Sequence, residues 1–159
     1  MRKSIAVSAT TILLAACAAP QGQAPATYAE APKPARCEPA PSEVVVKDIT
    51  PGTGKAVGFR SAVNVWYTGW LYDGCAPDFK GKQFDSNAGK VPIGFMVGTG
   101  RVIPGWDEGL IGMKEKGKRL LIIPPNKGYG AREAPGGRIP PNSTLVFEVE
   151  LMNVVAYAN

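Results

Sequence analysis

The residues of this chain that could do chemistry are three cysteines, an aspartate and a tyrosine. The thiols are Cys17, Cys37 and Cys75, Asp85 follows a phenylalanine, and Tyr129 lies between two glycines, which predicts a loop that presents its ring. The 159 residues include no histidine. Because histidine is the usual general base and the commonest metal ligand, Ser-His-Asp catalysis, Cys-His catalysis and His-ligated metal sites are excluded.

The first sixteen residues have the pattern of an export signal. Arg2 and Lys3 are basic, and residues 5–16 form an uncharged, mostly apolar run. A run of about twelve residues is too short to span a bilayer as a helix, but it has the length of a signal-peptide core. We therefore expect residues 1–16 to be a signal peptide and the protein to be exported.

Cys17 follows Leu-Ala-Ala, a sequence that resembles the lipobox of bacterial lipoproteins. The resemblance implies cleavage before Cys17 and acylation of its thiol, and two or more acyl chains attach a protein firmly to a bilayer. Ala18 stands where an aspartate would suggest retention in the inner membrane, so we expect the periplasmic side of the outer membrane. An ordinary secretory signal with an incidental cysteine is the alternative.

Residues 17–42 are rich in Ala, Pro, Gln and Glu and have no apolar periodicity. Such a segment cannot bury enough surface to offset its ordering entropy, so we expect a disordered tether before a domain at residues 43–157. In an oxidising compartment Cys37 and Cys75 either form a disulfide or remain free thiols. A disulfide would favour an ordered arm near Cys37.

The folded part has one credible helix, at residues 104–113, which begins with a proline that suits the first helical position. A parallel sheet would need a helix for each crossover. We therefore expect an α+β domain, in which a curved antiparallel β-sheet is wrapped around one short helix. β-branched runs and alternating patterns predict strands at 44–49, 62–72, 83–86, 93–97, 118–123 and 144–155, with a polar loop at 73–82.

The formal charge of +5 is spread along the chain without a basic run. Recognition of nucleic acid needs basic residues clustered on one face, so we do not expect a nucleic-acid partner.

Five segments of the folded part carry a family resemblance through their order and spacing. They are ITPGTG at 49–54, VWYTGWL at 65–71, QFDSN at 83–87, PIGFMVGTGRVIPGWDEGL at 92–110 and GYGAREAPGGRIPPNSTLVFEVEL at 128–151. Together they resemble the FKBP family, the macrolide-binding peptidyl-prolyl cis–trans isomerases. The resemblance covers essentially the whole folded part and implies an aromatic pocket between helix and sheet.

The resemblance also implies a role for each pocket residue. Trp106 is expected at the floor, and Asp85 at the edge, near the carbonyl that precedes the substrate proline. The phenol of Tyr129 and the backbone N–H of Ile103 are expected to donate hydrogen bonds to the ligand. The residues expected to contact substrate are Tyr67, Phe84, Phe95, Val102, Ile103, Ile139 and Phe147. From periodicity alone, Tyr67, Trp106 and Phe147 would be assigned to the core.

Such a pocket can catalyse rotation about the X–Pro bond with no nucleophile, metal or cofactor. The planar amide has a strongly polarised carbonyl, whereas the twisted transition state has lost that resonance. A dry apolar pocket therefore disfavours the ground state relative to the transition state. A thousandfold acceleration needs about 4 kcal/mol of differential binding. We expect an isomerase that assists the folding of exported proteins, with proline-containing polypeptides as substrates and macrolides as candidate inhibitors.

Three positions depart from the usual family pattern. Ile93 stands where a pocket phenylalanine is common and Arg138 where an apolar rim residue is common, while Lys90 is the nearest basic side chain after Asp85. The alternatives to an active isomerase are a binding module or holdase for proline-containing partners, and a surface interaction factor. The presence of Tyr129 together with Asp85 favours the isomerase. Nothing resembles the dimerising helical arm of some exported relatives, so we expect a monomer.

Overall fold

The computed structural model describes residues 37–132, 134 and 136–155. The expected signal peptide, Cys17 and the tether up to residue 36 lie outside this part. Within it, no helix is long and apolar enough to cross a membrane.

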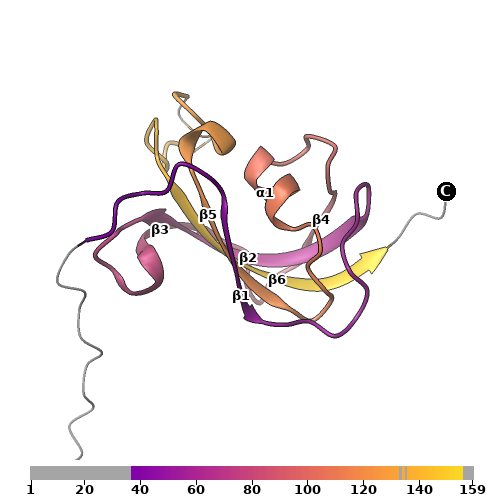
Figure 1. Ribbon diagram of the computed structural model, residues 1–159. Coiled ribbons are helices and arrows are strands. Elements are labelled where there is room, and N and C mark those ends of the chain that lie inside the picture. Colours follow the sequence, from indigo (N-terminus) through magenta and orange to yellow (C-terminus); the bar gives the residue numbers. More distant parts are fainter. Residues whose placement is uncertain (1–36, 133, 135, 156–159) are drawn as a thin grey trace, which may run out of the picture. The chain divides into compact units, whose positions relative to one another are not determined.

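One antiparallel sheet of six strands forms the scaffold of the described residues, and their single α-helix, α1 (Pro104–Gly109), lies on the inner side of the bend of the sheet (Figure 1). The strand order is β1-β5-β6-β2-β3, and β4 pairs with the same edge of β2 as β3 does. This architecture confirms the expected α+β class. The strands are β1 (Val45–Thr50), β2 (Ala62–Tyr72), β3 (Lys80–Ser86), β4 (Ile93–Met96), β5 (Lys118–Ile123) and β6 (Leu145–Val155).

The main apolar core lies between the inner face of the sheet and α1. The helix packs closely on β5 because Gly105 has no side chain, and a Cβ there would collide with Ile123. Burial of apolar surface in such a core is the main driving force for folding. Alternate residues of β2 and β6 are buried on this face: Val63, Val65, Leu145, Phe147, Val149 and Leu151.

Helix α1 is shorter than the predicted 104–113 and ends at Gly109. The chain turns at Gly112, which has a φ of +76°, a conformation that glycine adopts without steric cost. The backbone groups that follow the helix bond to another segment: Gly112 N–H donates to Val57 O, and Val57 N–H donates to Met113 O. This non-local pairing stops the helix.

A second apolar cluster, which the sequence did not predict, lies on the outer face of the sheet. The loop predicted as polar at 73–82 contributes to it, because a 3₁₀ turn, η1 (Pro77–Phe79), stacks Phe79 on Tyr72 with ring centroids 5.4 Å apart. Strand β3 then begins at Lys80 rather than residue 83, since Lys80 pairs with Tyr72. The cluster comprises Leu120, Ile122 and Val146, packed against Trp70, Tyr72 and Phe79.

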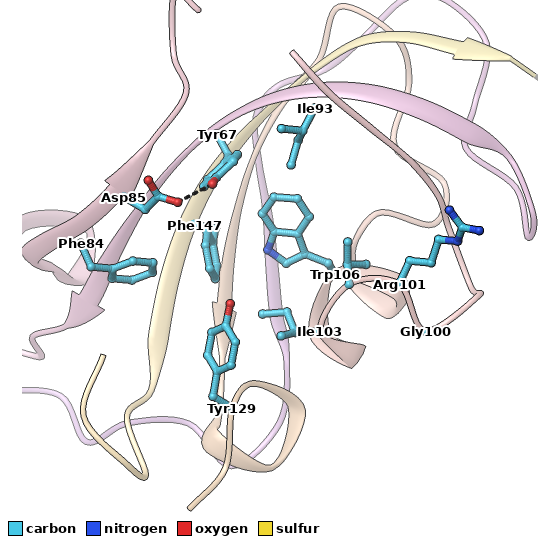
Figure 2. Close-up of a pocket in the computed structure, with 11 residues that line it drawn as sticks. Tyr67, Phe84, Asp85, Ile93, Gly100, Arg101, Ile103, Trp106, Tyr129 and Phe147 are labelled. Carbon is cyan, nitrogen blue, oxygen red and sulfur yellow. Dashed lines mark hydrogen bonds between the residues drawn. The ribbon is translucent and has the colours of Figure 1, made fainter. Parts of the chain in front are cut away.

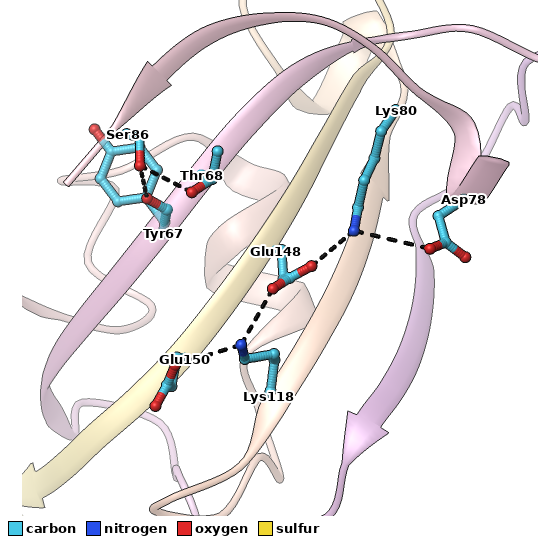
Figure 3. A network of polar contacts seen from close by, with 8 residues as sticks. All are labelled: Tyr67, Thr68, Asp78, Lys80, Ser86, Lys118, Glu148 and Glu150. Carbon is cyan, nitrogen blue, oxygen red and sulfur yellow. Dashed lines mark hydrogen bonds and ion pairs between the residues drawn. The ribbon is translucent and has the colours of Figure 1, made fainter. Parts of the chain in front are cut away.

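The outer face also carries a chain of ion pairs (Figure 3). Glu148 lies 2.7 Å from Lys80 Nζ and 3.3 Å from Lys118 Nζ, and Lys118 Nζ lies 3.6 Å from Glu150. Burial alone would raise the pKa of Glu148, but the hydrogen bonds and charges of Lys80 and Lys118 outweigh it and lower that pKa. The network joins β3, β5 and β6 across the sheet.

Residues 37–39, which fall in the segment expected to be a tether, contact the domain in this structure. Cys37 and Cys75 form a disulfide with Cα atoms 4.3 Å apart. Glu38 N–H donates to Gly74 O, and the Tyr72 hydroxyl donates to the carbonyls of Glu38 and Pro39. The ordered arm that a disulfide would favour is therefore present.

Candidate functional site

A pocket of about 380 Å³ opens between α1, the sheet and the loop before α1 (Figure 2). It contains eight of the residues expected there: Tyr67, Phe84, Asp85, Val102, Ile103, Trp106, Tyr129 and Phe147. Three further lining residues, Ile93, Gly100 and Arg101, were not among the predicted site residues. The side chains come from β2, β3, β4, α1, β6 and two loops, so the sheet and helix together fix the pocket.

Two residues predicted to contact substrate do not line the pocket. Phe95 lies behind its floor, with its ring centroid 5.5 Å from that of Trp106. Ile139 is buried in the main core with 5% of its surface exposed. On β4 the lining residue is instead Ile93, which shares a strand face with Phe95 but lies nearer the opening.

Trp106 is the centre of an aromatic cluster. Its ring centroid lies 5.2 Å from that of Tyr67 and 5.2 Å from that of Phe147, both in edge-to-face geometry. Phe84 meets Phe147 edge-on at 5.6 Å. Such pairs prefer this geometry and fix one another's orientation, so the pocket walls are held in place before any ligand binds.

Gly69 of β2 makes room for these walls. A Cβ at this position would lie 2.5 Å from Phe84 Cζ and 2.9 Å from Phe147 Cε1. Only glycine allows both rings to pack over the strand, and the segment around Gly69 therefore shapes the pocket without touching a ligand.

Asp85 and Tyr67 form the main polar contact of the pocket. The Tyr67 hydroxyl donates to Asp85 Oδ2 at 2.5 Å, and the Ser86 N–H donates to Asp85 Oδ1 at 2.9 Å. The nearest basic side chain after Asp85 in the sequence, Lys90, places its Nζ 3.4 Å from the carbonyl oxygen of Ser86. Asp85 is thus held by a phenol and a backbone N–H.

The two pocket phenols keep their protons to unusually high pH. Burial, together with the hydrogen bond and charge of Asp85, raises the pKa of Tyr67 far above its ordinary value. Burial and the charge of Asp85 also raise the pKa of Tyr129. Both hydroxyls are therefore neutral hydrogen-bond donors under ordinary conditions.

The two donors expected to bind the ligand have no partner among the described residues, and neither does the buried indole N–H of Trp106. The Tyr129 hydroxyl points into the pocket from the loop after η2 (Pro125–Lys127) (Figure 2). The Ile103 N–H precedes the first turn of α1 and also donates to no described group. Because hydrogen-bonding groups that lie away from water normally find partners, these two donors are available to a ligand.

Asp107 holds the loop that forms one side of the pocket, a role that the sequence did not predict. Its carboxylate accepts hydrogen bonds from Gly98 N–H at 2.7 Å and from Gly100 N–H at 3.0 Å. The loop continues through Gly100 and Arg101, which line the opening. A carboxylate one residue after a pocket tryptophan was the available signal, but its partners are loop amides that no local pattern specifies.

A protein-family model described as FKBP-type peptidyl-prolyl cis-trans isomerase matches residues 54–152. The chain belongs to the FKBP-type peptidyl-prolyl isomerase family. The expected family, and with it the activity of rotating X–Pro peptide bonds, is thereby confirmed. The family binds proline-containing peptides and FK506-type ligands.

Individual relatives agree with this assignment. An FK506-binding protein of Neisseria meningitidis serogroup A is 47% identical over 112 residues, which cover 70% of this chain and 95% of the relative. FK506-binding protein 1 of Aspergillus oryzae is 46% identical, covering 68% and 95%. The match to this FKBP domain therefore extends over nearly the whole of each relative.

Solved structures show the same fold. The crystal structure of FkpA from Escherichia coli matches with a TM-score of 0.58 and 42% identity, covering 70% of this chain and 47% of that one. A peptidyl-prolyl cis-trans isomerase from Pseudomonas syringae pv. tomato matches with a TM-score of 0.58 and 37% identity, covering 71% and 76%. The expected sheet wrapped around a short helix is thus shared with solved FKBP domains.

Proposed function

We propose that this FKBP domain isomerises X–Pro bonds in exported polypeptides by binding the proline ring over Trp106. The observation that carries the proposal is an aromatic pocket lined by Ile103 and Tyr129, whose N–H and O–H have no partner among the described residues. In this proposal these donors bind carbonyls of the substrate on either side of the rotating bond. Asp85 lies at the edge, beside the carbonyl that precedes the proline.

Catalysis follows from the difference between the planar and twisted amides. The planar form has a polarised carbonyl that water solvates well, and the apolar walls cannot replace that solvation. The twisted form is less polar, so its transfer into the pocket costs less free energy. Together with one or two hydrogen bonds, this difference is on the scale of the ~4 kcal/mol that a thousandfold acceleration requires.

The test is a protease-free isomerisation assay with the purified, oxidised chain. Micromolar protein should accelerate cis–trans exchange of a Leu-Pro peptide, measured by NMR exchange spectroscopy. Trp106→Ala should abolish most of the acceleration. The matched control is Trp66→Ala, because Trp66 lies on the opposite face of β2 and donates its indole N–H to Lys90 O.

Thermal unfolding of both variants separates catalysis from folding. If the loss of activity in Trp106→Ala is explained wholly by unfolding, Trp106 is a core residue and not a catalytic one. If the wild-type chain gives no rate increase, the pocket serves only to bind proline-containing partners.

We also propose that the protein is a monomeric lipoprotein of the cell envelope, anchored through Cys17. The apolar leader and the Leu-Ala-Ala-Cys sequence support it, and the Cys37–Cys75 disulfide agrees with an oxidising compartment. Metabolic labelling with a fatty acid should mark the wild-type chain and fail with Cys17→Ala. Labelling that persists in the variant would disprove the anchor.

The same proposal includes affinity for FK506-type macrolides, since several relatives carry that ligand in their names. A macrolide should compete with the Leu-Pro peptide for the pocket. Sedimentation of the detergent-solubilised chain would test the monomer.

A further inference from the structure

A second cavity, of about 490 Å³, adjoins the proline pocket. Its lining combines apolar surface with two basic side chains: Leu71, Lys82, Gln83, Phe84, Gly137, Arg138 and Pro140. Only Phe84 of these seven residues also lines the proline pocket, and no carboxylate is among the seven. We call this space the basic cavity.

The basic cavity borders the proline pocket at Phe84. This residue lines both spaces, and its ring is packed against Phe147 in the pocket wall. On the other side its backbone carbonyl accepts a hydrogen bond from Arg138 Nη1 at 3.2 Å. One residue therefore separates the two spaces, and a peptide that passes over Phe84 would enter both.

The charges of the two spaces are opposite. Asp85 is the acidic group of the proline pocket, whereas Lys82 and Arg138 are exposed cations at the basic cavity. Within the described part of the chain, no carboxylate lies within ion-pairing distance of either cation. Three basic residues on the strands, Lys80, Lys118 and Arg119, do have such partners.

We propose that the basic cavity selects substrates with an acidic side chain within three residues of the isomerised proline. The inference rests on the proposed isomerase function and adds a substrate class to it. Consecutive Cα atoms are about 3.8 Å apart, so a side chain one to three positions away can cross Phe84 while the proline stays over Trp106. The apolar stem of a glutamate would lie on Leu71 and Pro140, and its carboxylate would face Lys82 and Arg138.

The experiment compares peptides that differ only in charge. Each is N-acetylated and C-amidated, contains one Leu-Pro bond, and carries Glu, Gln or Lys at a single position within three residues of the proline. For the oxidised wild-type chain at low ionic strength, kcat/KM should be about three- to fivefold higher for Glu than for Gln at one or more positions, the range expected of an exposed ion pair. Salt at 0.5 M should reduce this ratio towards one, because the Debye length falls well below 10 Å.

Charge reversal provides the decisive comparison. In Lys82→Glu/Arg138→Glu the preference should invert, so that the Lys peptide exceeds the Glu peptide. The matched control is Lys47→Glu/Lys114→Glu, which changes the net charge equally at exposed positions that line neither the proline pocket nor the basic cavity. The control should keep the wild-type preference for Glu.

Because Arg138 also bonds Phe84 O, the double variant could unfold. Lys82→Glu alone, on the exposed side of β3, should then reduce the Glu-to-Gln ratio to about one. The ratio is taken within each variant, so a general change in activity does not affect it.

The inference is overturned if Glu and Gln peptides are equivalent at every position, or if the control variant loses the preference as fully as the reversed one. Dissociation constants for the same peptides keep this outcome separate from the proposed activity. If binding shows the Glu preference but no peptide is isomerised, the proposed isomerase activity is contradicted and the proposed selection by the basic cavity is supported. If Gln and Glu peptides are isomerised equally, the isomerase activity is supported and the proposed selection of acidic substrates is contradicted.

Discussion

At the scale of single residues, the pocket places a few polar atoms among apolar rings. The Tyr67 hydroxyl is committed to Asp85, whereas the Tyr129 hydroxyl and the Ile103 N–H have no partner in the described part of the chain. A pre-aligned donor can bind the carbonyl of a rotating amide without first breaking another hydrogen bond. Tyr67 therefore stabilises the structure of the pocket, whereas the hydroxyl of Tyr129 is available to bind a ligand.

Tyr129→Phe should lower kcat/KM for a Leu-Pro peptide by about three- to tenfold, which corresponds to one hydrogen bond. The melting temperature should remain within about 2 °C of the wild type, because the hydroxyl has no partner among the described residues. Exchange spectroscopy and a thermal melt test both statements. An unchanged rate would remove Tyr129 from the ligand-binding groups.

The raised pKa values of Tyr67 and Tyr129 predict the alkaline pH dependence. A phenol whose folded-state pKa exceeds its unfolded value of 10.0 stabilises the fold below pH 10, and that contribution is lost only as the pH rises further. Neither phenol should therefore cause a loss of kcat/KM between pH 7 and 10. A fall in this range that is absent in Tyr129→Phe would contradict the prediction.

At this scale the family pattern in the sequence predicted most of the residues that line the pocket. It was less successful where side-chain packing determines whether a residue lines the pocket or lies behind it. Phe95 and Ile93 alternate on one strand face, so periodicity cannot tell which one reaches the opening. Ile139 is apolar in a loop, which suits a rim and a core equally. Asp107 binds amides seven and nine residues before it, and such loop contacts have no sequence period.

At the scale of elements, the loop before α1 depends on Asp107. Asp107→Ala should leave Gly98 and Gly100 N–H without their acceptor and loosen the segment that carries Arg101, Val102 and Ile103. We expect KM to rise several-fold more than kcat falls, because the loss affects binding geometry. Asp107→Asn, which retains one acceptor oxygen, should be intermediate. Equal activity of Asp107→Ala and wild type would show that the loop holds its position by other contacts.

For the arm at residues 37–39, the sequence left both order and disorder open. It has no apolar periodicity, and its order depends on a disulfide, a tyrosine hydroxyl and one backbone hydrogen bond. These partners lie more than thirty residues away along the chain, so local composition could only predict a tether. The short helix has a similar explanation, since its end is determined by pairing with Val57.

Cys37→Ser/Cys75→Ser should reduce the free energy of unfolding by about 2–4 kcal/mol, because the bridge joins residues 38 apart and restricts the unfolded chain. Urea unfolding of the double variant and of the oxidised wild type measures the difference. Reduced wild type should resemble the variant. Coincident midpoints for oxidised and reduced protein would show that the arm contributes nothing to stability.

At the scale of the whole molecule, Arg119 joins the edge of the sheet to the end of the helix. Its guanidinium forms a two-point contact with Asp48 of β1, at 2.6 and 3.2 Å. It also donates to the carbonyls of Gly109, the last residue of α1, and of Ile111 just after it. The side chain is 8% exposed, whereas that of Asp48 is 49% exposed. The contact thus connects β1, β5 and α1 through one largely buried cation.

Arg119→Met should destabilise the domain by about 2–4 kcal/mol, since the two carbonyls at the helix end lose their donor in a buried place. Asp48→Asn should cost less, because Asp48 remains half exposed to water. Chemical denaturation of both variants tests this order. The reverse order would mean that the ion pair with Asp48, and not the helix end, accounts for the contribution of Arg119.

The tryptophans divide between the two faces of the sheet, and this gives the protein an optical signal of its own. Trp106 is 4% exposed and surrounded by Tyr67, Phe95 and Phe147, while Trp66 and Trp70 belong to the opposite face of β2. A ligand over the indole of Trp106 changes the polarity around one fluorophore and leaves the other two unaffected. In a Trp66→Phe/Trp70→Phe background, the emission of Trp106 would report occupancy of the pocket directly, without a labelled substrate.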